Sequence, residues 1–135
     1  MAWIEPKTDW TVKDFFNASD YNRIIGNLKF LQDFSLHMFK KIEFADLGAE
    51  KDYESFIYAR EVNNIENNLE TLNLASYKLS IGNKTVYRDN GNTPLFGEFN
   101  RLESAMLKLY NMMQAHYGSL ARLSFTLGGQ KGFKV

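Results

Sequence analysis

The sequence predicts an all-α protein, a single domain in which three main helices form a bundle with extended N- and C-terminal arms. Three observations lead to this fold class. Apolar residues recur at helical spacing in three segments. These segments share one pattern and so form an internal repeat. The length of 135 residues suits one domain, and 44% apolar residues suffice to build its core.

The first part of the chain, residues 1–18, is expected to form an extended N-terminal arm. Thr11 and Asp14 have the spacing of a capping motif and predict a short turn within it. Aromatic side chains are concentrated here, and aromatic residues carry many protein interfaces. Two readings stay open, since the arm could face a partner or dock onto its own bundle. The candidate interface residues are Trp3, Trp10, Phe15, Phe16 and Tyr21.

The three repeats are residues 20–31, 61–72 and 98–109, and each has apolar side chains at its second, fifth, ninth and twelfth positions. Steps of three, four and three residues place these side chains on one face of a helix. The repeats therefore predict three amphipathic helices that bury these faces against one another. The predicted core positions are Tyr21, Ile24, Leu28 and Leu31; Val62, Ile65, Leu69 and Leu72; and Phe99, Leu102, Met106 and Leu109.

Each repeat opens with residues that favour the start of a helix. An acidic residue comes first, where the positive end of the helix dipole stabilises it. Ser19 is expected to cap the first helix, and Thr93 followed by Pro94 is expected to cap the third.

Glycine residues are expected to end the helices, because glycine readily adopts the left-handed conformation of a helix C-terminus. The candidates are Gly48, Gly82 and Gly118. With these limits the predicted helices are residues 19–41, 59–79 and 94–117. The helical core then covers residues 19–118, and residues 119–135 form a C-terminal tail.

Two connections join the predicted helices. Residues 42–55 form an acidic link that has room for a short helix at 50–56. Residues 80–93 contain a short β-prone run at 84–87 followed by an Asn-Gly turn signal. A small hairpin and an irregular loop are both compatible with that pattern.

An asparagine occupies the third position of every repeat: Asn22, Asn63 and Asn100. An amide side chain near a helix start can bond free backbone groups or a neighbouring helix, so we expect a structural role. The sixth position is Glu66 and Glu103 in the later repeats but Ile25 in the first. This difference argues against a metal or acid–base function shared by all three repeats. 

The sequence offers no positive sign of catalysis, so we expect no enzymatic activity, bound metal or cofactor. There is no cysteine, and His37 and His116 each lie late in a predicted helix, where the dipole favours imidazolium. Glu66 and Glu70 could touch one cation, but the Glu-x-x-His motifs of a di-metal bundle are missing. The glycine-rich end, residues 128–132, does not precede a helix as a phosphate-binding loop does.

The charge balance excludes other classes of partner. Sixteen Lys and Arg match sixteen Asp and Glu, so we expect neither nucleic-acid binding nor attachment to anionic lipid. No apolar run reaches the length of a membrane span, and the N-terminus does not read as a signal peptide. The charge is unevenly spread, since residues 43–70 hold eight acids against two bases and residues 104–135 hold four bases and no acid. Two solvated faces of opposite sign, or a complementary contact between copies, would explain this.

Several blocks of the sequence resemble a known group of proteins. The start, PKTDWT at residues 6–11 and DYNRI at 20–24, is similar to the start of small proteins encoded among the tail and minor structural genes of phages and prophages of low-GC Gram-positive bacteria. EVNNIE at 61–66 and EFNRLE at 98–103 resemble recurrent helix starts in such proteins. The end, residues 122–129, is similar to their C-termini.

The resemblance implies a non-enzymatic structural protein of a phage tail or baseplate, and it supplies no functional residues. Its expected partners are other tail proteins or further copies of itself in a homo-oligomer, and its expected location is the virion, or the host cytoplasm during assembly. One alternative is a tail assembly chaperone that is absent from the mature virion. Another is a small metal-dependent enzyme.

Overall fold

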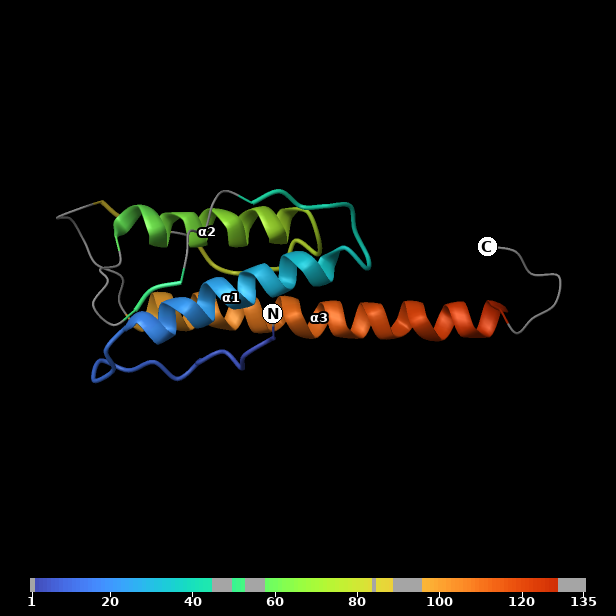
Figure 1. The fold of residues 1–135 in the computed structure, drawn as a ribbon, viewed down its shortest axis with the longest axis horizontal. Helices are drawn as coiled ribbons and strands as arrows, with labels where there is room; N and C mark the ends of the chain where they lie inside the picture. Colours follow the sequence, from blue (N-terminus) through green and yellow to red (C-terminus); the bar gives the residue numbers. More distant parts are fainter. Residues whose placement is uncertain (1, 45–49, 53–57, 84, 89–95, 129–135) are drawn as a thin grey trace.

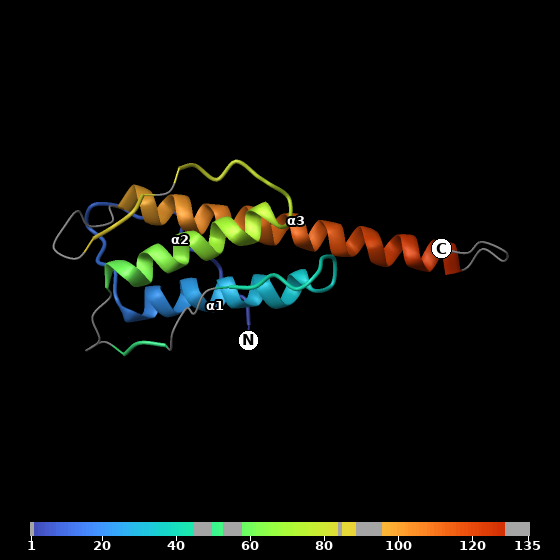
Figure 2. The same cartoon turned by 90° about the horizontal axis from the view of Figure 1, so that it is seen from above.

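A computed structural model describes residues 2–44, 50–52, 58–83, 85–88 and 96–128. It contains three α-helices, α1 (Ala18–Ser35), α2 (Ala59–Leu74) and α3 (Phe96–Gly128). They lie side by side in one bundle, and α3 extends beyond the other two (Figures 1 and 2). The all-α prediction is confirmed. Within the described residues no strand occurs; residues 80–83 and 85–88 are irregular, and the Asn-Gly turn of the hairpin alternative lies outside the described residues.

The core consists of the repeat faces. All the apolar positions predicted from the three repeats are buried, with at most 7% of any of these residues exposed. Ile24, Leu28 and Leu31 of α1 meet Leu69 and the corresponding residues of α2 and α3 in one cluster. Since burying a large aliphatic side chain contributes about 1.5–3 kcal/mol, this cluster supplies the main stabilisation of the fold.

α1 begins at Ala18, one residue before the predicted start, and its cap lies two residues before the predicted one. Asn17, rather than Ser19, is the N-cap, and its amide oxygen accepts the backbone N–H groups of Ser19 and Asp20 at 3.1 and 3.3 Å. The carboxylate of Asp20 accepts the N–H of Asn17 in return, at 3.1 Å. Asn17 replaces the predicted cap because only from this position does Asp20 complete a reciprocal capping box. At α2 the Glu61 carboxylate similarly accepts the N–H of Tyr58, at 2.9 Å. The caps predicted at 93–94 lie outside the described residues.

The predicted helix ends are wrong in both directions. α1 stops at Ser35 and α2 at Leu74, which is earlier than residues 41 and 79. After α2 the chain reverses at Lys78, which adopts the left-handed conformation (φ 54°) and donates its N–H to the carbonyl of Asn73 at 2.9 Å. Lys78 thus takes the role predicted for Gly82, which does have a positive φ but follows four residues later.

α3 does not stop at Gly118 but continues to Gly128. The predicted tail of residues 119–135 is therefore corrected, because its first ten residues are helical. A glycine inside a helix weakens it by about 1 kcal/mol relative to alanine without ending it. The predicted stop at Gly48 lies outside the described residues, as does most of the short helix predicted at 50–56; residues 50–52 are not helical.

Candidate functional site

Each repeat asparagine holds the backbone of one distant residue through two hydrogen bonds. The amide nitrogen donates to that residue's carbonyl, and the amide oxygen accepts that residue's N–H, as a neighbouring β-strand would. These bonds satisfy backbone groups that the packed segment would otherwise withdraw from water unpaired. The pairs are Asn22 with Lys51 (both bonds 2.7 Å), Asn63 with Tyr87 (both 2.8 Å) and Asn100 with Trp10 (3.0 and 2.7 Å).

The clamped residues lie in three extended segments, which we call strap 1 (residues 2–10), strap 2 (residues 50–52) and strap 3 (residues 79–83 and 85–88). Each clamped residue lies eight or nine residues before the start of the next helix. Each strap is held by the helix of the repeat before it: strap 2 by α1, strap 3 by α2 and, closing the circle, strap 1 by α3. The repeat unit is therefore a strap plus a helix, and three units form a cyclic arrangement with approximate three-fold order.

Two ion pairs between helices follow the same cyclic order. An arginine at the fourth repeat position binds a glutamate at the sixth position of a neighbouring repeat. Arg23 of α1 binds Glu103 of α3 with two bonds of 2.7 and 2.8 Å, and Arg101 of α3 binds Glu66 of α2. At the third interface, between α2 and α1, Asn64 stands in place of the arginine and Ile25 in place of the glutamate. Both charged residues of the pair are thus replaced together.

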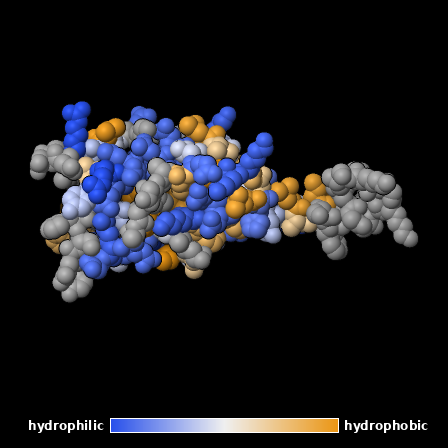
Figure 3. Space-filling view, turned by 45° about the horizontal axis from the view of Figure 1, so that its top comes forward, coloured by the Kyte–Doolittle hydropathy of each residue, from blue (hydrophilic) through white to orange (hydrophobic). Residues whose placement is uncertain are grey.

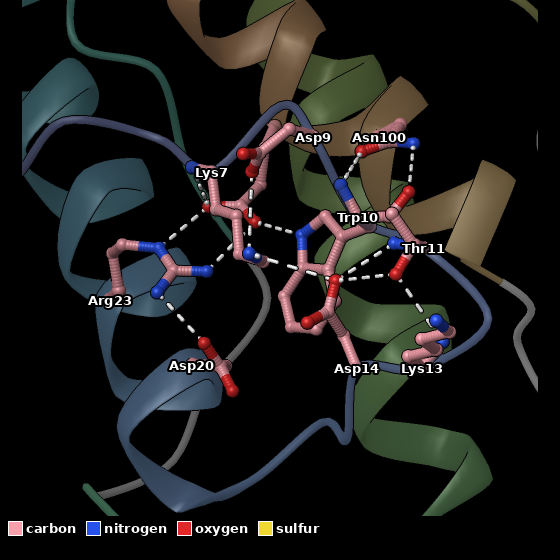
Figure 4. Close-up of polar contacts among 10 residues, drawn as sticks. Lys7, Asp9, Trp10, Thr11, Lys13, Asp14, Asp20, Arg23 and Asn100 are labelled. Carbon is pink, nitrogen blue, oxygen red and sulfur yellow. Dashed lines mark hydrogen bonds and ion pairs between the residues drawn. The ribbon is translucent and has the colours of Figure 1, made fainter.

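The carboxylate of Glu103 is fully buried and accepts four hydrogen bonds. Besides the two from Arg23, it accepts the backbone N–H of Lys7 at 3.1 Å and the indole N–H of Trp10 at 2.6 Å. Figure 4 shows Arg23 and Trp10 pointing toward one another from α1 and the arm. Burial opposes the charge of Arg23, but its hydrogen bonds to Glu103 and Asp20 outweigh this and raise its pKa. A buried carboxylate is tolerated here because its acceptor sites are filled.

The N-terminal arm packs on its own bundle along its length. Trp3 stacks on Tyr110 of α3, with ring centres 4.1 Å apart. The backbone of Ile4 is held by two bonds to the amide of Asn27 in α1, at 3.0 and 2.7 Å. Strap 1 therefore fills the groove between α1 and α3. Of the two alternatives for the arm, docking onto its own bundle is the one seen in the structure.

The five candidate interface residues fall into three groups. Trp10 and Tyr21 are buried in the core, and their bulk stabilises the bundle. Trp3 is partly buried, as is Phe16, which stacks on Phe99 with ring centres 4.2 Å apart. Phe15 is 88% exposed. The structure therefore leaves Phe15 as the member of this set whose ring is available to a partner without rearrangement.

An apolar pocket of about 450 Å³ lies where the arm meets the start of α3, and its lining includes Asp14 and Phe16, the neighbours of Phe15 in the chain. Trp10, Phe16, Phe96 and Phe99 contribute to its walls. Val12, also in its lining, is 79% exposed. Three large apolar side chains of this region are exposed, Val12 at 79%, Phe15 at 88% and Phe96 at 43%, and exposed apolar side chains that gather in one patch mark a binding surface.

The turn at the edge of this pocket is the one that the spacing of Thr11 and Asp14 predicts. The carboxylate of Asp14 accepts the backbone N–H of Thr11 at 2.8 Å, and the N–H of Asp14 bonds back to the carbonyl of Thr11 at 3.1 Å. The bond from the Thr11 N–H lowers the pKa of Asp14, with a further contribution from the charge of Lys7. The pocket thus carries a fixed negative charge at its edge.

The histidines bridge elements rather than ending helices. His37 lies beyond the end of α1 and packs against Phe34 and Tyr117. His116 lies within α3, so its predicted place near a helix end is wrong; its Nδ1 is 2.8 Å from the hydroxyl of Tyr77. Within the described ranges, no three His, Asp or Glu side chains are grouped to hold a metal ion.

Sequence reasoning missed the strap partners and the two ion pairs. The signal for the ion pairs was present, because the repeat that has Ile25 instead of glutamate is also the one whose neighbour has Asn64 instead of arginine. The strap partners left no such signal, since a backbone partner of an asparagine has no preferred residue type. In comparisons with protein-family models, curated proteins and solved structures, none matches this chain. Among the described helices none is both long and apolar enough to cross a membrane.

Proposed function

We propose that this chain is a non-enzymatic structural protein of a phage or prophage tail or baseplate that acts through protein–protein contacts. The observation that carries the proposal is the apolar surface at the arm end of the bundle. There Phe15 and Val12 are 88% and 79% exposed, and Val12 lines an apolar pocket. Aromatic side chains such as Phe15 are enriched in protein–protein interfaces. The phage context comes from the resemblance of the sequence blocks described above.

The rest of the molecule suits a rigid subunit. The straps are tied to the helices by side-chain amides, and the helices are joined by buried ion pairs. Rigid subunits lose little conformational entropy on association, which favours assembly from many copies. Closed symmetric rings are the common way in which such copies assemble.

Mass spectrometry of purified particles from an induced source strain tests the proposal. We expect the chain in the particles at a fixed copy number relative to the major tail protein. A Phe15→Ser variant, which changes an exposed ring and spares the core, should fold normally but be incorporated less. Absence of the chain from particles that contain every other tail protein would contradict a structural role.

A tail assembly chaperone is the second candidate. The part of α3 that extends beyond the other helices favours the chaperone function (Figure 1). An exposed amphipathic helix can bind a partner by placing its apolar face in a groove of that protein. In that case the chain would be abundant in the lysate and bound to a tail protein, yet missing from mature particles. The same mass spectrometry separates the two functions.

A further inference from the structure

The buried face of α3 continues beyond the bundle. Its positions follow alternating steps of three and four residues, the spacing of a helix that packs against another helix. Within the bundle Met106, Leu109 and Met113 are fully buried and His116 is partly buried, whereas beyond it Leu120 is 39% exposed and Leu123 is 54% exposed. The face consists of Met106, Leu109, Met113, His116, Leu120 and Leu123.

The change from buried to exposed occurs where the partner helices end. α1 stops at Ser35 and α2 at Leu74, and Tyr117 makes a ring contact back to α1, on Phe34 at 5.5 Å. From there α3 projects alone, and apolar side chains gather on the projecting part (Figures 1 and 3). We call residues 117–128 the projecting helix. Its face is thus continuous with the interface that α3 already makes inside its own bundle.

Gly118 lies at the base of the projecting helix. A Cβ placed on it would meet nothing within 4 Å, so packing within the described chain does not require a glycine there. Glycine in a helix costs about 1 kcal/mol relative to alanine. The lack of a side chain does, however, allow another backbone to approach closely.

We propose that the projecting helix pairs with the projecting helix of a second copy in an antiparallel, two-fold symmetric dimer. At its base, the apolar face of the projecting helix meets the ends of α1 and α2. The bundle therefore leaves no room there for the folded domain of a partner. A second copy must therefore approach from the opposite end of the projecting helix, so that the two bundles lie at opposite ends of the helix pair. The sequence of residues 117–128 contains one charged residue, Arg122, so self-pairing buries leucine against leucine with few like charges brought together.

The contact is small, which sets its expected strength. The projecting helix is about 17 Å long at a rise of about 1.5 Å per residue, and its interface is smaller than that of a typical stable complex. We expect a dimer that forms at high protein concentration and dissociates on dilution. The proposal goes beyond the proposed function, which is carried by the surface at the arm end of the bundle and not by the projecting helix. Because the dimer is measured on purified protein, its failure is distinguishable from absence of the chain in particles.

Sedimentation equilibrium of the full-length protein over a concentration series tests this inference. We expect the mass to rise from 15.6 kDa to twice that value. Leu123→Lys, and separately Leu120→Lys, should keep the mass at that of the monomer at every concentration. Both leucines are exposed in the monomer, so circular dichroism of the variants should match that of the unchanged protein.

Val86→Lys is a matched control, because Val86 is 64% exposed but lies next to Tyr87, which Asn63 holds near the start of α2 and thus far from the projecting helix. It should dimerise as the unchanged protein does. Small-angle scattering then tests the orientation, since an antiparallel pair should nearly double the maximum dimension. A monomer at all concentrations, a dimer that survives both lysine substitutions, a dimer lost in Phe15→Ser instead, or a dimer no longer than the monomer would each overturn the proposal.

Discussion

At the scale of single residues, Asn100 joins the two ends of the cyclic arrangement. Its side chain bonds both backbone groups of Trp10. In Asn100→Ala these groups lose their partners at a site where water has poor access, and an unpaired buried polar group costs about 1–3 kcal/mol. We expect the free energy of unfolding to fall by about 2–4 kcal/mol, measured by urea denaturation. Asn111→Ala, at an exposed position of the same helix, should change it by less than about 0.5 kcal/mol. Equal effects of the two substitutions would contradict the clamp.

At the scale of elements, the ion pairs set how neighbouring helices meet. Arg101→Asn removes the arginine from the buried carboxylate of Glu66, and breaking a buried pair from one side costs about 3–5 kcal/mol. The third interface uses asparagine and isoleucine at the same repeat positions. Adding Glu66→Ile should therefore recover part of the loss, with a coupling energy of about 1–3 kcal/mol in a double-mutant cycle. Strict additivity of the two substitutions would show that the pair does not act as a unit.

The arm is a second element whose removal has a defined consequence. The sequence alone suggests that deleting residues 1–10 would leave the fold intact and lower the mass of an oligomer. In the structure this deletion removes Trp10 from the core and two donors from Glu103. We therefore expect a lower melting temperature in calorimetry. Trp10→Ala should already cost about 3–5 kcal/mol, and an unchanged melting temperature in both variants would show that the arm does not stabilise the bundle.

At the scale of the whole molecule, stability depends on pH at both ends of the range. Burial opposes the charge of Glu61, but bonds from the Tyr58 N–H and Lys51 outweigh it and lower its pKa below the ordinary value of 4.5. The pKa of Asp14 is also lowered. A carboxyl whose pKa is lower in the folded state stabilises the fold above its unfolded pKa and loses this effect as the pH falls through the folded value. Urea midpoints should therefore fall on acidification below the unfolded pKa values.

The opposite sign applies to Tyr77, which is partly buried, and to Tyr87, which is buried. Burial raises the pKa of Tyr77 and of Tyr87 above 10.0. A tyrosine with a raised pKa favours the folded state while neutral and loses this contribution as the pH rises through the folded value. We expect the urea midpoint to fall again in alkali. Tyr87→Phe should flatten the alkaline limb, and an unaltered limb in this variant would show that Tyr87 does not contribute.

The sequence predicts the helix faces well because burial imposes a strict spacing on side chains such as Ile24, Ile65 and Leu102. It predicts the helix ends poorly, because they depend on local bonds such as that from Lys78 to Asn73 and on how far a neighbour extends. The asparagines stood out by their position, but their partners are backbone groups that any residue provides. Among the aromatic candidates, the sequence could not separate Phe15 from Trp10, because exposure follows from tertiary packing.

The closure of strap 1 onto α3 fixes an order of events during synthesis. Trp10 and Arg23 leave the ribosome early, yet their partners Asn100 and Glu103 follow some ninety and eighty residues later. Until α3 is made, Arg23 lacks the carboxylate of Glu103 and the backbone of Trp10 lacks the side-chain amide of Asn100. Because domains fold as units during synthesis, the arm is the last strap to dock although it is the first to be made. A released chain truncated before residue 100 would therefore present Trp10 to proteases, and a chain that includes α3 would not.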